Sequence, residues 1–130
     1  MSEINRFQLK FKFWLETTEG ESLMGEGKWL LLKAIRDTGS LQSAVKERGY
    51  AYRQTWDNLK KLEERLGFQL IEKSRGGEHG GSTRLTRKGE KMVAFFDLLY
   101  AQANPELEKL FQDLLQELQQ ISEPELDLEN

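Results

Sequence analysis

The side chains most suited to chemistry lie in residues 51–66, where an arginine, a glutamine and several lysines occur at helical spacing. Arg53 and Gln54 stand near the start of this stretch, and Lys60 and Lys61 follow further along it. A guanidinium or a carboxamide at the start of a helix can make paired hydrogen bonds to base edges in a major groove, whereas lysine ammonium groups suit phosphates. The spacing therefore predicts nucleic-acid recognition.

Catalytic chemistry has little support in the sequence. His79 is the only histidine and the chain has no cysteine, so no cluster stands at metal-ligand spacing. Glu63 and Glu64 are adjacent on the predicted helix and point in different directions, which suits solvent or salt bridges to nearby lysines better than acid-base catalysis. The segment GEGKW at 25–29 lacks the spacing of a phosphate loop, with Trp29 at the hydroxyl position. We expect no enzyme, no metal and no cofactor.

Residues 40–66 predict two helices joined by a tight turn at Gly49, which is a helix-turn-helix. Ser40 stands where an N-cap belongs, a role that we favour over a phosphate contact by the same hydroxyl. A preceding helix over residues 27–37 stops near Gly39 and completes a three-helix core. The positions predicted on the inner faces of the two later helices are Leu41, Ala44, Val45, Tyr52, Trp56, Leu59, Leu62 and Leu66.

Strand signals flank these helices. Residues 7–15 alternate apolar and polar side chains, the period of a half-buried strand, and residues 22–24 can pair back as a hairpin that packs on the helices. After Gly67, residues 68–73 and 84–85 predict two strands joined by a glycine-rich loop, a wing. In this wing Arg75, His79 and Arg84 offer donors to phosphates or a minor groove; the alternative is a merely disordered tip.

The last third of the chain predicts helices. Thr86 can cap a long helix that Asn104-Pro105 interrupts, after which a second helix carries an apolar seam. Because the seam has no partner within so small a domain, we expect homodimerisation. The residues predicted to mediate dimerisation are Phe96, Leu99, Tyr100, Leu107, Leu110, Leu114 and Leu118. The acidic residues 122–130 are expected to be disordered.

Charge is separated along the chain, although the formal net charge is only -3. Residues 25–91 hold 15 Lys and Arg against 9 Asp and Glu, and residues 92–130 hold 1 against 9. A basic middle with an acidic tail fits a DNA-facing module joined to a segment that stays off DNA. No apolar run reaches the roughly 18 residues of a membrane span and the N-terminus lacks the core of a signal peptide, so we expect no membrane partner and a cytoplasmic location.

Three motifs carry a family resemblance: TGSLQSAV, AYRQTW, and RGGEHGGSTRLTRKGE, together with GEGKWLLLKAI and LEERLGFQLIEK. With them the chain resembles the DNA-binding domain of ModE-type molybdate-responsive regulators, a winged-helix group related to the LysR-type regulators. The resemblance covers roughly residues 7–100. It implies dimeric, groove-reading transcriptional control, with Tyr52, Arg53 and Gln54 at the DNA and the wing glycines beside its backbone.

Two departures from the family limit what the resemblance implies. Ala51 replaces the serine that often precedes Tyr-Arg in these proteins, so a cap or phosphate contact by that hydroxyl is lost. ModE proteins also usually continue into oxyanion-binding domains, whereas an acidic helix follows here, so we do not expect molybdate sensing to transfer.

The sequence thus predicts an α+β, mainly α fold: a hairpin over residues 1–24, a winged helix-turn-helix over 25–85, dimerisation helices over 86–121 and a tail over 122–130. The predicted function is sequence-specific binding of double-stranded DNA by a homodimer. The alternatives are a protein-interaction module that uses the apolar seam of the second C-terminal helix and, more weakly, an oxyanion sensor. The residues predicted to contact DNA are Ser40, Gln42, Tyr50, Tyr52, Arg53, Gln54, Asp57, Lys60, Lys61, Arg75, Gly77, His79 and Arg84.

Overall fold

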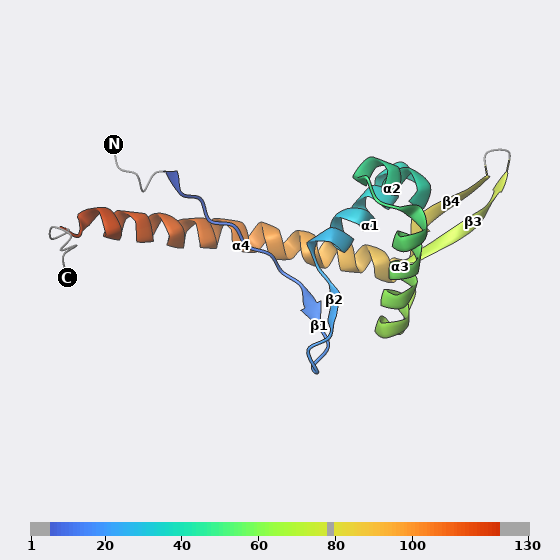
Figure 1. The fold of residues 1–130 in the computed structure, drawn as a ribbon, viewed down its shortest axis with the longest axis horizontal. Coiled ribbons are helices and arrows are strands. Elements are labelled where there is room, and N and C mark those ends of the chain that lie inside the picture. Colours follow the sequence, from blue (N-terminus) through green and yellow to red (C-terminus); the bar gives the residue numbers. More distant parts are fainter. Residues whose placement is uncertain (1–5, 78–79, 123–130) are drawn as a thin grey trace, which may run out of the picture. The chain divides into compact units, whose positions relative to one another are not determined.

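The computed structural model describes residues 6–77 and 80–122, with the backbone alone at 75–77 and 80–81. Its elements, shown in Figure 1, are β1 (Leu15–Glu16), β2 (Ser22–Met24), α1 (Glu26–Thr38), α2 (Leu41–Arg48), α3 (Tyr52–Leu66), β3 (Ile71–Gly77), β4 (Gly80–Leu85) and α4 (Arg87–Gln120). Contacts divide the chain into two compact units, Lys12–Leu98 and a second unit of Met1–Phe11 with Leu99–Asn130. Helix α4 begins in the first unit and ends in the second.

Helices α1, α2 and α3 form the core of the first unit, and local signals set their ends. The hydroxyl of Ser40 accepts the amide proton of Ser43 at 2.8 Å, which caps α2. Gly39 and Gly49 end α1 and α2 with φ of 79° and 74°, a left-handed conformation that glycine adopts without steric cost. The predicted helix-turn-helix and its cap at Ser40 are confirmed.

The strands β3 and β4 form an antiparallel ribbon, which confirms the predicted wing (Figure 1). Ile71 pairs with Leu85, and both side chains are buried at the root of the ribbon. The pairing extends outward to Gly77 and Gly80, so the wing is longer than the strand signals at 68–73 and 84–85 predicted. The fold of this unit is therefore a winged helix-turn-helix.

Thr83 ties the wing to the helices. Its amide donates to the carbonyl of Gly39 at 2.9 Å, and its hydroxyl accepts the amide proton of Leu41 at 3.2 Å. The side chain of Thr83 is buried, so both bonds are shielded from competition by water. The wing strand thus fixes the turn between α1 and α2 and satisfies a first-turn amide of α2.

Glu63 and Gly89 hold the other end of the wing. A carboxylate oxygen of Glu63 accepts the amide protons of Leu70 and Ile71 at 2.7 and 3.1 Å, and its side chain is 7% exposed. Sequence reasoning placed Glu63 in solvent or in a lysine salt bridge; the bridge to Lys60 exists at 3.1 Å, but the carboxylate is buried. A methyl group at Gly89 would overlap the carbonyl oxygen of Leu70, so α4 approaches β3 closely there.

The N-terminal hairpin is shorter than predicted. Leu15 pairs with Met24 and Glu16 with Ser22, whereas residues 7–14 have no regular secondary structure. The expectation of a strand over residues 7–15 is wrong because β2 ends where α1 begins, and no partner remains for the ladder hydrogen bonds that alternation requires. The hairpin still packs on the core, where Met24 is buried.

Helix α4 begins where Thr86 accepts the amide proton of Gly89 at 3.0 Å, as the sequence predicted. The predicted interruption is wrong, because α4 continues through Asn104 and Pro105. Proline removes one helical hydrogen bond and its ring crowds the carbonyl four residues before it. The strong helix formers on either side carry the helix through this position. Within the described ranges, no helix is long and apolar enough to cross a membrane.

The structure contradicts the predicted place of Phe96 on the dimer surface. Its side chain is fully buried in the first unit, and its ring stacks on Trp29 with centroids 6.4 Å apart. Val93 is buried on the same face of α4. Helical periodicity shows that a face is apolar but not which surface covers it. Here the first unit, which contains Phe96, covers this side chain itself.

Candidate nucleic-acid interface

Side chains of α3 form four rows at a spacing of four residues, because such residues lie one above another on a helix. The core row consists of Thr55, Leu59 and Glu63, all buried. The opposite row is the outer ridge, with Arg53, Asp57 and Lys61, all exposed. The other two rows flank the ridge: Tyr52, Trp56 and Lys60 on the side of the wing, and Gln54 and Asn58 on the side of α1.

The outer ridge offers Arg53 to a ligand. It is exposed on the first turn of α3, and the part of the chain that the structure describes provides it with no salt bridge. A guanidinium in this position has all its fork donors available for a planar acceptor pair such as the edge of guanine. The exposure of Arg53 leaves the guanidinium free to reach a ligand, and its predicted contact with bases stays a prediction.

On the wing flank, two lysines contact one indole. The Lys60 and Lys73 ammonium groups lie 4.4 and 4.5 Å from the centre of the Trp56 ring. Lys73 also donates to the Tyr52 hydroxyl at 2.9 Å. Trp56 was predicted in the core, but it is only half-buried. The two ammonium groups lie over its ring outside the core, an arrangement that cation–π attraction favours.

The two ammonium groups differ in their charge balance. Lys60 bonds Glu63 at 3.1 Å, whereas Lys73 has no acidic partner among the described residues. Lys73 is therefore an uncompensated cation whose position is fixed by an aromatic hydroxyl and an indole. Sequence reasoning did not identify Lys73, because the contact with Tyr52 joins residues 21 positions apart.

Lys73 lies in a cleft of about 190 Å³ between α2, α3 and the wing, the wing-side cleft. Ser40, Gln42 and Tyr52, all predicted to contact DNA, line it together with Thr83. The hydroxyls of Ser40 and Thr83 already serve the amides of Ser43 and Leu41. The amide of Gln42, the remaining donor of that helix start, has no hydrogen-bond partner among the described residues. A helix start beside a lysine favours a phosphate.

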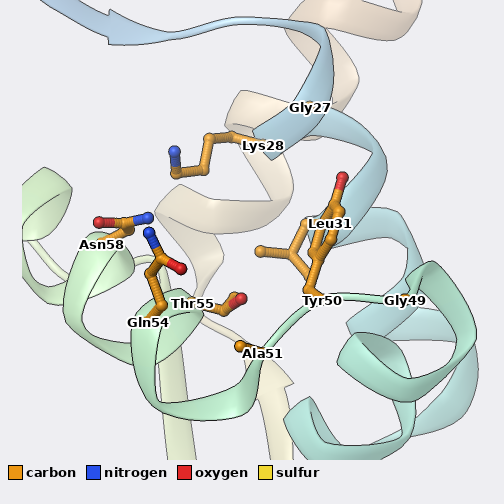
Figure 2. A pocket seen from close by; sticks show the side chains of 9 residues that line it. All are labelled: Gly27, Lys28, Leu31, Gly49, Tyr50, Ala51, Gln54, Thr55 and Asn58. Carbon is orange, nitrogen blue, oxygen red and sulfur yellow. The ribbon is translucent and has the colours of Figure 1, made fainter.

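A second cleft, the α1-side cleft, has a volume of about 400 Å³ and lies between α1 and α3 (Figure 2). Figure 2 shows the ends of Lys28, Gln54 and Asn58 gathered at one side, with Tyr50 and Leu31 at the other. Of the residues that line it, Gln54 and Tyr50 were predicted to contact DNA, while Lys28 and Asn58 were not. Gln54 thus lies beside α1 rather than on the ridge with Arg53.

The predicted wing residues are only partly described. Arg84 is exposed and bonds Glu72 at 2.9 Å across the ribbon. His79 and the side chain of Arg75 lie outside the described residues, and Gly77 is described only as the β3 residue that pairs with Gly80. The predicted roles of these three positions therefore stay predictions.

Comparison with known families identifies the type of helix-turn-helix that this geometry represents. Residues 28–90 match the model of the bacterial regulatory helix-turn-helix protein, lysR family, and this range covers α1 from Lys28 onward, α2, α3 and the wing. This segment is a LysR-type helix-turn-helix domain. The match begins at Lys28 in α1 and ends at Glu90 in the first turn of α4. It includes every residue that lines the wing-side cleft and all those that line the α1-side cleft except Gly27.

Curated relatives refine the type of domain. The chain is 38% identical over 69 residues to the transcriptional regulator ModE of Yersinia pestis and 35% identical over 69 residues to the DNA-binding transcriptional dual regulator ModE of Escherichia coli K12; each match covers 53% of this chain and 26% of the relative. It is 35% identical over 78 residues to the molybdenum-pterin-binding protein MopB of Rhodobacter capsulatus, covering 60% of this chain and 29% of that protein. The LysR-type domain is therefore of the ModE type, and the matched segment spans less than a third of each of these relatives.

The second unit holds most of the predicted dimerisation residues. Tyr100 stacks on Phe11 with ring centroids 5.7 Å apart, and Leu99 and Leu107 are half-buried. Leu110, Leu114 and Leu118 are exposed by 63, 47 and 45%, and we call these three the leucine seam. No group of three or more potential metal ligands occurs in the part of the chain that the structure describes.

Proposed function

We propose that the protein is a DNA-binding transcriptional regulator that inserts α3 into a major groove, with Arg53 on the outer ridge reading base edges. The observation that carries the proposal is the pairing of this exposed ridge with the wing-side cleft, where the uncompensated ammonium of Lys73 stands beside the start of α2. A ridge that can reach bases and a flanking phosphate site are the two parts that groove recognition needs. The ModE-type character of the domain supports the same function.

In this arrangement the wing contacts the sugar-phosphate backbone. Lys73 and Lys60 approach one strand from the Trp56 face, and Gln42 donates its free amide to a phosphate nearby. The contacts anchor the domain without reading sequence. Arg53 then provides most of the discrimination between base pairs.

Selection of bound duplexes from a random pool tests the function, at about 150 mM salt because affinity depends strongly on ionic strength. We expect the wild-type protein to enrich one defined sequence motif. A pool that stays random while the protein is folded would contradict sequence-specific recognition.

We further propose that the regulator acts as a homodimer joined through the leucine seam. Three exposed leucines at helical spacing form an apolar stripe that water solvates poorly, and a second copy of the same helix offers a matching stripe. Two-fold symmetry would place two α3 helices in successive major grooves about 34 Å apart. The enriched motif should then be an inverted repeat.

The same leucine seam supports a second candidate, docking of a partner helix in a protein-interaction module without a DNA role. The two candidates predict different effects for removal of a charge from the outer ridge and for addition of a charge to the leucine seam. A module that acts only through the seam loses its function with Leu114→Glu and keeps it with Arg53→Ala. A DNA-binding regulator loses base discrimination with Arg53→Ala.

A further inference from the structure

The α1-side cleft has the features of an anion site. Lys28, Gln54, Asn58 and Tyr50 contribute an ammonium group, two carboxamides and a phenol, and no acidic residue is among those that line the cleft. Lys28 has no salt bridge among the described residues. Its charge is therefore uncompensated, as is that of Lys73 in the wing-side cleft.

The two clefts lie on opposite flanks of α3. Tyr52, Trp56 and Lys60 face the wing, and Gln54 and Asn58 face α1, with the outer ridge between the two rows. A helix in a major groove about 12 Å wide has a sugar-phosphate strand on each side. An interface with a cation on only one flank would hold one strand and leave the other without a charged partner.

We propose that the α1-side cleft binds a backbone phosphate of the DNA strand opposite the one that the wing contacts, with Lys28 as the charged group and Asn58 and Gln54 as neutral donors. The inference rests on the proposed DNA-binding function and adds a second anchor to it. Lys28 and Lys73 then hold the two walls of the groove, and this fixes the rotation of α3 about its own axis. Arg53 is aimed at the bases as a result.

Salt dependence tests the anchor, measured by fluorescence anisotropy of a labelled duplex of mixed sequence from low to moderate ionic strength. Each phosphate contact contributes about 0.9 to the slope of log K against log salt. We expect Lys28→Gln to lower that slope by about 0.9 and the affinity at physiological salt by about five- to tenfold, equally for all duplex sequences. Lys28→Arg, which keeps the charge, should retain the slope.

Two variants serve as matched controls. Lys46→Gln removes an exposed lysine of α2 that lines neither cleft, and it should leave the slope at the wild-type value. Asn58→Asp places a negative charge inside the cleft and should weaken binding more than Asn58→Ala does. Thermal unfolding of each variant reports whether the fold is retained.

The possible results separate the inference from the function. If the wild-type protein binds duplex DNA and Lys28→Gln matches it in slope and affinity, the second anchor is wrong and the proposed function stands. If the wild-type protein binds no duplex, both are wrong.

A free anion is the other source of the same chemistry. Titration with inorganic phosphate, followed by NMR on the side-chain amides of Gln54 and Asn58, distinguishes it. Shifts that depend on Lys28, together with unchanged DNA binding by Lys28→Gln, would assign the cleft to a free oxyanion and overturn the proposal. Shifts that duplex DNA produces at micromolar concentration, and that Lys28→Gln abolishes, support it.

Discussion

The ammonium group of Lys73 donates a hydrogen bond of 2.9 Å to the hydroxyl of Tyr52, which links the wing to the first turn of α3. Lys73 also lies over the Trp56 ring, so its charge is held beside the start of α2. A lysine fixed in this way loses less conformational freedom when it meets a phosphate than a free surface lysine does.

The first prediction concerns this pair. Lys73→Gln should weaken binding to every duplex by about five- to tenfold and lower the salt slope by about 0.9, because one phosphate contact is lost. Tyr52→Phe keeps the aromatic ring and the charge, so its slope should match the wild type while its affinity falls modestly. Anisotropy titrations at several salt concentrations measure both, with Lys46→Gln as the control. An unchanged slope for Lys73→Gln would remove the wing-side cleft from the interface.

The second prediction concerns the root of the wing. Glu63→Ala leaves the buried amides of Leu70 and Ile71 without their acceptor, and such losses destabilise a fold by about 2–4 kcal/mol. Glu64→Ala, one position along on an exposed face, should change the free energy of unfolding by less than about 0.5 kcal/mol. Urea denaturation at one fixed protein concentration compares them. Equal stability of the two variants would show that the carboxylate of Glu63 does not hold the wing.

The third prediction uses two glycines. Gly89→Ala should destabilise the fold by about 1–3 kcal/mol, because the new methyl group displaces the Leu70 carbonyl, which also accepts the amide proton of Thr86 at 2.9 Å. Gly27→Ala has no atom within 4 Å of the added methyl and should stabilise α1 by about 0.5–1 kcal/mol. The same urea experiment measures both, and a stabilising Gly89→Ala would contradict the close approach of α4 to β3.

Local signals in the sequence predicted the elements of the interface well. Ser40, Gly39 and Gly49 set helix ends through hydrogen bonds and backbone conformations confined to a few residues, so the helix-turn-helix could be predicted from the chain alone. The same holds for Thr86, which caps α4 through its own first turn.

Features that depend on a distant partner could not be predicted in this way. Residues 7–14 alternate as a strand does, but whether a strand forms depends on a free neighbour, which β2 does not supply. The contact of Lys73 with Tyr52 and the covering of Phe96 by Trp29 join segments far apart in sequence. The burial of Glu63 depends on how the chain folds back after α3, so that the amides of Leu70 and Ile71 meet its carboxylate. Lys28 and Asn58 carried no signal, because single polar residues on a helix are common.

The fourth prediction concerns assembly. Leu114→Glu places a charge in the centre of the leucine seam and should convert a dimer to a monomer in sedimentation equilibrium, because a buried unpaired charge is strongly unfavourable at an apolar interface. Gln116→Glu adds the same charge on the opposite side of α4 and should leave the dimer intact. A wild-type protein that sediments as a monomer at all concentrations would rule out the homodimer.

The fifth measurement tests the central claim, that α3 reads DNA through its outer ridge. Base preference is determined at every position of the enriched site for the wild type, for Arg53→Ala and for Arg65→Ala, an exposed arginine of the same helix that bonds Glu21 at 3.1 Å. We predict that Arg53→Ala loses about 1–3 kcal/mol of discrimination at one base pair in each half-site and keeps the rest of the profile. Arg65→Ala should keep the whole profile. A full wild-type profile for Arg53→Ala would contradict the claim.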